Sequence, residues 1–299
     1  MKSTLLAIAL ATLLPAAAHA DLKIFACEPE WGALAKEIGG THVSVYTATT
    51  AMQDPHRIEA RPSLIARARN ADLLVCTGAE LEVGWLPVIL AQSGNAAIQA
   101  GQPGQFLAAR YVTMLEKPAS LDRAAGDVHA DGNPHIQTDP RNFIPVGEAL
   151  AARMASLDPA EAPRYRAGWA EFRARWIAAI ARWEKAAAPL RGVPVVAQHQ
   201  AFPYLQSWLG LKQVAVLEPK PGVEPSLASL AAVKARLAET PAKMVLRAAY
   251  QPARPSEWIA GQTGMKAVVL PFTVGGDAQS GDLFGLFNST VSKLLAGLN

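Results

Sequence analysis

The chain has 299 residues, of which 51% are hydrophobic and 18% are charged, and its formal net charge at pH 7 is +3. This length suits two domains of roughly 100 to 200 residues each. So small an excess of positive charge, without a basic patch interleaved with aromatic side chains, argues against a nucleic acid or an anionic membrane as partner.

Residues 1–20 have the features of a secretory signal peptide. The segment MKSTLLAIALATLLPAAAHA carries one positive charge at Lys2, an apolar core, and the small-x-small ending Ala18-His19-Ala20. We expect cleavage before Asp21, which places the mature chain outside the cytoplasm, in the periplasm. The rest of the sequence has no run of 18 or more apolar residues, so we predict a mature protein that is soluble or loosely peripheral.

Strand-like and helical segments alternate through the first half of the mature chain. Strands are predicted at Leu22 to Cys27, Val43 to Thr47 and Asp72 to Cys76. Helices are predicted at Trp31 to Ile38, from Pro62-Ser63 onward, and at Leu86 to Gln92. Such alternation favours βαβ units and a parallel sheet.

The second half has the same order of elements without a repeat in the sequence. Strands are predicted at Val193 to Ala197, Val214 to Leu217, Lys243 to Ala248 and Ala267 to Leu270. Helices are predicted at Phe202 to Leu209, Ser226 to Leu237, Pro255 to Gln262 and at the C-terminus up to Leu298. We therefore expect an N-terminal lobe over 21–142, a linking helical region over 143–188 and a C-terminal lobe over 189–299.

One long helix is predicted between the halves, from about Pro159 to Ala188. Aromatic and aliphatic residues recur in it at three- and four-residue steps and so form one stripe: Trp169, Phe172, Trp176, Ile180 and Trp183. Thirty residues would run about 45 Å, which is longer than one small domain, so the helix should lean against both lobes. Core packing is a better interpretation of the stripe than a ligand platform.

The two cysteines, Cys27 and Cys76, each end a predicted strand. An oxidising compartment permits a disulfide between them. The alternative is a pair of buried, reduced thiols that act as small hydrophobic side chains. The sequence leaves both open, because it does not give the distance between the two Cα atoms.

Three histidines lie in short polar motifs that follow apolar runs. The motifs are Asp54-Pro55-His56, Asn133-Pro134-His135 and Gln198-His199-Gln200. We place each histidine where a strand ends and a loop begins, and the loops at the carboxyl ends of parallel strands converge on one crevice. Because neutral imidazole is a common zinc ligand, this pattern predicts a metal site built from distant segments. The alternative is three unrelated surface or capping histidines.

At these motifs the chain resembles the periplasmic solute-binding proteins of metal-specific ABC transporters, the zinc and manganese uptake receptors. The resemblance rests on ADLLVCTGAELEVGWLP, DPHRIEARPS, NPHIQTDP and HQAFPYL, which occur in the family's order and cover essentially the whole mature chain. It implies two α/β lobes, each a parallel sheet flanked by helices, joined by a long rigid helix. It also implies metal held between the lobes and delivered to a membrane permease, without chemistry.

The resemblance carries over His56, His135 and His199 as metal ligands. It also suggests that Glu59, three residues after His56, orients an imidazole by accepting its other N–H. Asp139 could do the same, although capping of the following helix suits it better.

The chain departs from the family pattern in two places. Many members supply a fourth ligand as an aspartate after the last strand, where this chain reads Leu270-Pro271-Phe272-Thr273. The fourth position is therefore open to Asp277, Glu218 or a water molecule. Zinc-uptake relatives often carry a long His-rich loop, whereas the segment Glu116 to Pro134 is short and holds only His129, which we interpret as a solvated loop residue.

Three imidazoles suit Zn²⁺, whereas Mn²⁺ favours more carboxylate and water oxygen. The sequence thus predicts a monomeric zinc receptor that is not an enzyme and binds no nucleic acid. A receptor for another divalent metal, a metal chelate or haem is one alternative. A mononuclear zinc hydrolase with Glu59 as general base is another, since three histidines with an open fourth position also occur in catalytic sites.

Overall fold

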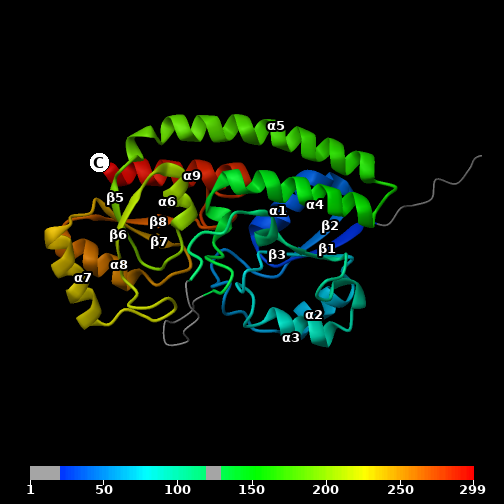
Figure 1. Ribbon diagram of the computed structural model, residues 1–299, viewed down its shortest axis with the longest axis horizontal. Helices are drawn as coiled ribbons and strands as arrows, with labels where there is room; N and C mark the ends of the chain where they lie inside the picture. The colour runs from blue at the N-terminus through cyan, green and yellow to red at the C-terminus, as the bar shows by residue number, and fades with distance from the viewer. Residues whose placement is uncertain (1–20, 119–128) are drawn as a thin grey trace, which may run out of the picture.

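The protein contains two parallel four-stranded sheets that lie side by side, each flanked by helices. The computed structural model describes residues 21–118 and 129–299, so the expected signal peptide lies outside the described residues. Figure 1 shows the N-terminal sheet in blue and the C-terminal sheet in yellow and orange, with one long helix running above both. This arrangement confirms the predicted α/β fold with two lobes.

The N-terminal sheet has the strand order β2-β1-β3-β4, and all its pairings are parallel. Its strands are β1 (Leu22–Ala26), β2 (Val43–Thr47), β3 (Leu73–Cys76) and β4 (Gln105–Leu107). The helices around it are α1 (Pro29–Gly39), α2 (Pro62–Arg69) and α3 (Leu86–Ser93). The sequence did not predict β4, which has only three residues.

The C-terminal sheet repeats this topology with the order β6-β5-β7-β8, again with parallel pairings. Its strands are β5 (Pro194–Ala197), β6 (Lys212–Val216), β7 (Met244–Ala248) and β8 (Lys266–Leu270). Its helices are α6 (Pro203–Leu209), α7 (Leu227–Glu239), α8 (Ala253–Thr263) and α9 (Leu283–Leu298). In open α/β folds of this kind, ligands are expected outside the carboxyl ends of the strands.

The linking region contains two helices, α4 (Phe143–Leu157) and α5 (Ala162–Ala186). The long helix therefore begins later than predicted and has 25 residues, or about 37 Å at the usual rise per residue. It packs against α1 and α4 on the N-terminal side and against α9 on the C-terminal side. None of the helices in the described ranges is both long and apolar enough to span a bilayer.

The predicted stripe of α5 is buried along its whole length. Its rings meet those of α4 and α9: Trp176 packs against Phe143 at 5.4 Å and against Phe287 at 5.5 Å between ring centroids. This confirms core packing as the role of the stripe. One continuous core joins both lobes beneath α5.

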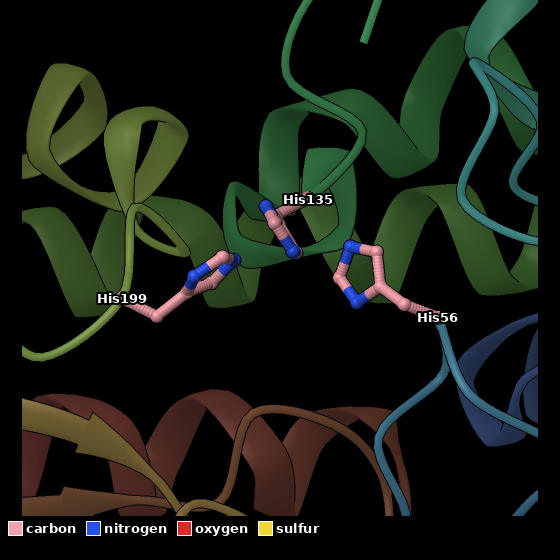
Figure 2. Close-up of side chains that lie close together, drawn as sticks. All are labelled: His56, His135 and His199. Atoms are coloured by element: carbon pink, nitrogen blue, oxygen red, sulfur yellow. The ribbon is translucent and has the colours of Figure 1, made fainter. Parts of the chain in front are cut away.

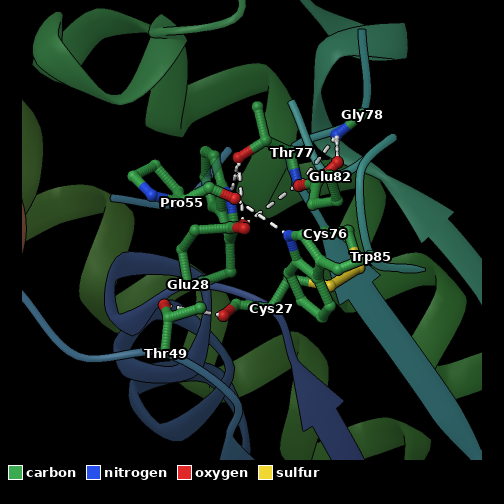
Figure 3. The surroundings of a disulfide bond; sticks show 10 residues. Cys27, Glu28, Thr49, Pro55, Cys76, Thr77, Gly78, Glu82 and Trp85 are labelled. Atoms are coloured by element: carbon green, nitrogen blue, oxygen red, sulfur yellow. Dashed lines mark hydrogen bonds between the residues drawn. A yellow bond between two sulfur atoms is a disulfide. The ribbon is translucent and has the colours of Figure 1, made fainter. Parts of the chain in front are cut away.

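A second core lies on the other face of the N-terminal sheet, under α2 and α3. It contains a disulfide between Cys27 and Cys76, whose Cα atoms are 4.8 Å apart (Figure 3). The strand order explains the bond, because β1 and β3 are neighbours and both cysteines lie at their carboxyl ends. Of the two possibilities left open by the sequence, the structure has the disulfide.

Candidate metal centre

The imidazoles of His56, His135 and His199 come together between the two lobes. One ring nitrogen from each lies within 4.8 Å of the others. The ring centroids are separated by 5.3 Å for His56 and His135, 5.9 Å for His56 and His199, and 5.3 Å for His135 and His199. Figure 2 shows the three rings approaching one another from three separate segments.

The segments differ in how they reach this point. His56 lies in a turn that follows β2, and His199 comes two residues after β5, as the sequence predicted. His135 instead precedes the short 3-10 helix Ile136–Thr138, and the described part of the chain has no strand just before it. The expectation that every histidine follows a strand is therefore wrong for His135.

The Asp-Pro-His and Asn-Pro-His motifs form the same turn. Asp54 Oδ1 accepts from the backbone N–H of His56 at 3.1 Å and from its ring Nδ1 at 2.8 Å. Asn133 Oδ1 accepts from the backbone N–H of His135 at 3.0 Å and from its Nδ1 at 2.8 Å. One side-chain oxygen thus fixes both the turn and the orientation of the imidazole two residues later.

His199 is held by a residue from another segment. Its Nδ1 lies 2.7 Å from Oε2 of Glu218, which follows β6, and the same oxygen accepts from the N–H of Gly222 at 2.9 Å. Since all three Nδ1 atoms meet oxygens, each ring carries its proton on Nδ1 and offers Nε2 as a lone-pair donor. The buried Nε2 atoms of His56 and His135 have no hydrogen-bond partner among the described residues.

Burial and the neighbouring rings favour the neutral form of His135, which is the form that can bind a metal. Burial lowers the pKa of the His135 imidazole well below its usual value, and the nearby rings of His199, His56 and His129 act in the same direction. Burial alone would raise the pKa of Asp54, but its hydrogen bonds and charge interaction with His56 outweigh that effect and lower it. A neutral His135 and an ionised Asp54 bonded to His56 both favour the binding of a cation.

Residues considered for other roles at this site lie elsewhere or act differently. Glu59 is exposed, so Asp54 and not Glu59 orients His56. Glu218 orients His199, and Asp277 binds Ser289 and Lys293 of α9. Asp139 caps the 3-10 helix Pro140–Asn142, as expected. Among the described residues, no carboxylate joins the three imidazoles as a fourth ligand.

Two small cavities and one aromatic ring surround the histidines. A cavity of about 170 Å³ is lined by Glu116, His129 and the rings of His135 and His199, and one of about 210 Å³ lies on the side of Asp54 and Glu218. His129 is half-buried and its ring centroid is 5.5 Å from that of His56, so it lies in the wall of the site rather than in solvent. Phe272 covers a third side, 5.6 Å from His135.

The sequence reasoning missed Asp54 and Asn133 as partners of the histidines. A signal was available, because both motifs have an Asx residue two positions before the histidine, which is the spacing of an Asx turn.

Comparison with known proteins identifies the family. Residues 24–297 match the model of the zinc-uptake complex component A, periplasmic (ZnuA). Because this match covers most of the chain, the chain belongs to that family.

Individual relatives are distant. The chain is 25% identical over 221 residues to the high-affinity zinc uptake system protein ZnuA of Bacillus subtilis, covering 73% of this chain and 67% of that protein. It is 26% identical over 272 residues to the ZnuA of Paracoccus denitrificans, covering 80% and 79%. It is 24% identical over 200 residues to the zinc-binding lipoprotein AdcA of Streptococcus pneumoniae, but spans only 39% of that longer protein.

Solved structures share the fold. A crystal structure of ZnuA superimposes with a TM-score of 0.76 at 22% identity, covering 93% of this chain and all of the other. The protein FpvC from Pseudomonas aeruginosa, in complex with Mn²⁺, gives a TM-score of 0.74 at 23% identity, covering 92% and 99%. At these identities the likeness concerns the fold and not the metal.

Proposed function

From its family and its site, we propose that this protein is an extracytoplasmic receptor that captures Zn²⁺ with His56, His135 and His199 and delivers it to an ABC permease. The observation that carries the proposal is the convergence of three imidazoles whose Nδ1 atoms are all engaged by oxygens. The three Nε2 atoms are then free to bind, and one ring nitrogen from each histidine lies within 4.8 Å of the others.

Zinc follows from the ligand set. Three neutral nitrogen ligands suit a four-coordinate Zn²⁺ ion, whereas Mn²⁺ favours a larger number of oxygen ligands. The relatives are named as zinc uptake and zinc-binding proteins, while a neighbour of the same fold binds Mn²⁺. The fold therefore does not discriminate between the metals, and the proposal of zinc rests on the nitrogen ligands.

A water molecule is the fourth ligand in this proposal, because the two cavities beside the histidines lead to the site. The lobes are 21–142 and 189–299, with 143–188 linking them. Since α5 packs against elements of both lobes, metal binding involves a small closure rather than a wide hinge motion. Small-angle scattering of the apo and zinc-loaded forms tests this, and a large decrease in radius of gyration would contradict it.

The remaining parts of the proposal concern the setting of the protein. A cleavable signal peptide over residues 1–20 directs it to the periplasm, where it acts as a monomer without nucleic acid and without catalysing a reaction. Glu59 is exposed, which disfavours the hydrolase alternative, because that alternative uses Glu59 as general base. Zinc-dependent turnover of an ester, amide or phosphate that disappears in Glu59→Gln would favour the enzyme instead.

Competitive titration with Zn²⁺ and Mn²⁺ tests the function. The wild type should bind one Zn²⁺ tightly, and His199→Ala should lose most of that affinity while it remains folded. His199→Glu should shift the preference toward Mn²⁺, since it replaces a nitrogen ligand with oxygen. Glu59→Gln serves as the control and should behave as the wild type. If His199→Ala binds zinc as tightly as the wild type, the proposed site is wrong.

A further inference from the structure

Two consecutive residues outside the ligand set contact the backbone that carries His56. Trp85 donates from its indole Nε1 to the carbonyl oxygen of Pro55 at 2.9 Å, and both groups are buried (Figure 3). Gly84 lies against the next peptide: a Cβ atom built on Gly84 would be 2.9 Å from the carbonyl oxygen of His56. The pair thus touches two successive carbonyl groups of the turn that positions the ligand.

Gly84 leaves room for the His56 peptide through the absence of a side chain. A real Cβ atom is essentially never found closer than 3.0 Å to another heavy atom, and the obstacle here is backbone, which does not swing aside. The φ angle of Gly84 lies outside the left-handed range, so an L-residue is permitted there by the backbone. A methyl group at residue 84 should therefore displace His56 rather than strain the backbone of residue 84 itself.

Gly84 and Trp85 are themselves held in place by hydrogen bonds of Glu82. The carboxylate of Glu82 accepts from the N–H of Thr77 at 2.7 Å and of Gly78 at 3.0 Å, directly after the disulfide-bonded Cys76. The carbonyl of Glu82 then accepts from the N–H of Trp85 at 3.1 Å. Trp85 also belongs to the core that contains the disulfide and Ile58, two residues after His56. A rigid support of this kind holds an imidazole within the narrow range of positions that metal coordination tolerates.

From these contacts we infer that Gly84 and Trp85 are positioning residues for the first zinc ligand: they set the position of His56, and with it the affinity and geometry of the metal site, without touching the metal. The inference rests on the proposed function. His135 and His199 have no contact with this pair in the hydrogen bonds and close approaches of the described chain, so the effect is specific to His56.

The test uses Gly84→Ala and Trp85→Phe, with Gly261→Ala as the matched control. Gly261 lies in α8, and a Cβ atom added there meets nothing within 4 Å. Removal of supporting partners of a metal ligand typically lowers metal affinity about 10- to 100-fold. We expect that range for Gly84→Ala, about tenfold for Trp85→Phe, and no change for Gly261→Ala, each measured by competition with a zinc chelator.

Two further readouts separate positioning from general destabilisation. With Co²⁺ in place of zinc, Gly84→Ala and Trp85→Phe should change the visible d–d spectrum, whereas a variant that is merely less stable keeps the wild-type spectrum in its folded fraction. In the His56→Ala background, Gly84→Ala should cause no additional loss of affinity. An additional loss in that background, or wild-type affinity and spectrum in both single variants, would overturn the inference.

Failure of the inference is distinguishable from failure of the proposed function. If the wild-type protein has no tight zinc site, the proposed function is wrong. NMR of the histidine rings in the metal-free protein still tests the positioning in that case. Gly84→Ala should then shift the ring signals of His56 more than those of His135 and His199. Equal shifts, or none at His56, would show that the pair does not position this residue.

Discussion

The two Asx-Pro-His turns have nearly the same geometry in different surroundings. Asp54 and Asn133 each accept from the backbone and the ring of the histidine two residues later, and corresponding distances differ by no more than 0.1 Å. However, Asp54 is only partly buried, whereas Asn133 is buried. The same turn is thus built with a charged acceptor near solvent and a neutral acceptor in the interior.

The difference follows from the cost of burying charge. A partly exposed carboxylate keeps part of its solvation, while a buried carboxylate without a cationic partner costs several kcal/mol. Asn133 also uses its Nδ2 group, which donates to Glu116 Oε2 at 3.0 Å and to the carbonyl of Gln200 at 2.8 Å. The groups around Asn133 Nδ2 are therefore acceptors. Only an amide can donate to them and also accept from His135. The following predictions test this difference between the turns.

Removal of a ligand gives the largest expected effect. His135→Ala should lower zinc affinity by more than the 10- to 100-fold that is typical for loss of an outer partner, because a nitrogen ligand itself is lost. His42→Ala is the control, since His42 lies far from the three rings, paired with Glu161 at 3.4 Å. Isothermal titration with zinc measures both. Equal affinities for the two variants would contradict the assignment of His135.

Exchange of the buried acceptor should destabilise the protein. Asn133→Asp keeps the bonds to His135 but turns a donor into an acceptor that faces Glu116 and the Gln200 carbonyl. The buried side chain then carries a charge close to the Glu116 carboxylate, and the loss of its bond to the partly buried Gln200 carbonyl costs about 1 to 3 kcal/mol. Denaturant unfolding of the metal-free protein should show a loss of at least that order, and a variant as stable as the wild type would refute this account of the turn.

Acidification should reveal the burial of His135. Its pKa is lowered in the folded protein, so the unfolded chain takes up a proton near the ordinary imidazole pKa of about 6.5 while the folded protein does not. His135 therefore lowers the stability of the folded protein as the pH falls from about 6.5 toward the folded pKa. Above about pH 6.5 this loss is absent. NMR titration of the metal-free protein should show a neutral His135 ring at pH 6, and a ring that is mostly protonated there would contradict the prediction.

Most of the fold could be predicted from the sequence. The strands of both sheets are apolar runs bounded by turn residues, and most helices have Pro or Gly near one end, so local pattern and final structure agree for most elements. The short β4 was missed because three residues are too few to form a recognisable apolar run. The long helix was predicted with three extra residues at its start, since Pro159 marks a turn before α5 rather than its first residue.

The site could be predicted only in part. Motif and resemblance identified the three histidines, but the residues that orient them depend on local turns and long-range contacts. Glu59 was assigned to His56 through the family resemblance, whereas an Asx turn uses the residue two positions before the histidine. The position of His135 depends on Tyr204 of the other lobe, whose hydroxyl donates to the carbonyl of Asn133 at 2.8 Å. No local pattern indicates a contact across 71 residues.

The partly exposed Asp54 should tolerate the exchange that the buried Asn133 does not. In Asp54→Asn the amide oxygen still accepts from the backbone and Nδ1 of His56, so both hydrogen bonds of the turn are kept. We expect a change in unfolding free energy within about 0.5 kcal/mol, as for other exposed substitutions, and a modest loss of zinc affinity because a carboxylate makes the imidazole a more basic ligand.

Asp54→Ala is the matched variant for this turn, since it removes the acceptor altogether and should cost the full 10- to 100-fold in zinc affinity that is typical for an outer partner. Chelator competition on both variants separates the contribution of the hydrogen bond from that of the charge. If Asp54→Asn loses as much affinity as Asp54→Ala, the charge is what matters at His56, and the two turns differ in electrostatics rather than in solvation. If Asp54→Asn stays close to the wild type while Asn133→Asp is destabilised, acceptor geometry is sufficient at His56, and burial together with the acceptors around Asn133 decides which residue each turn can carry.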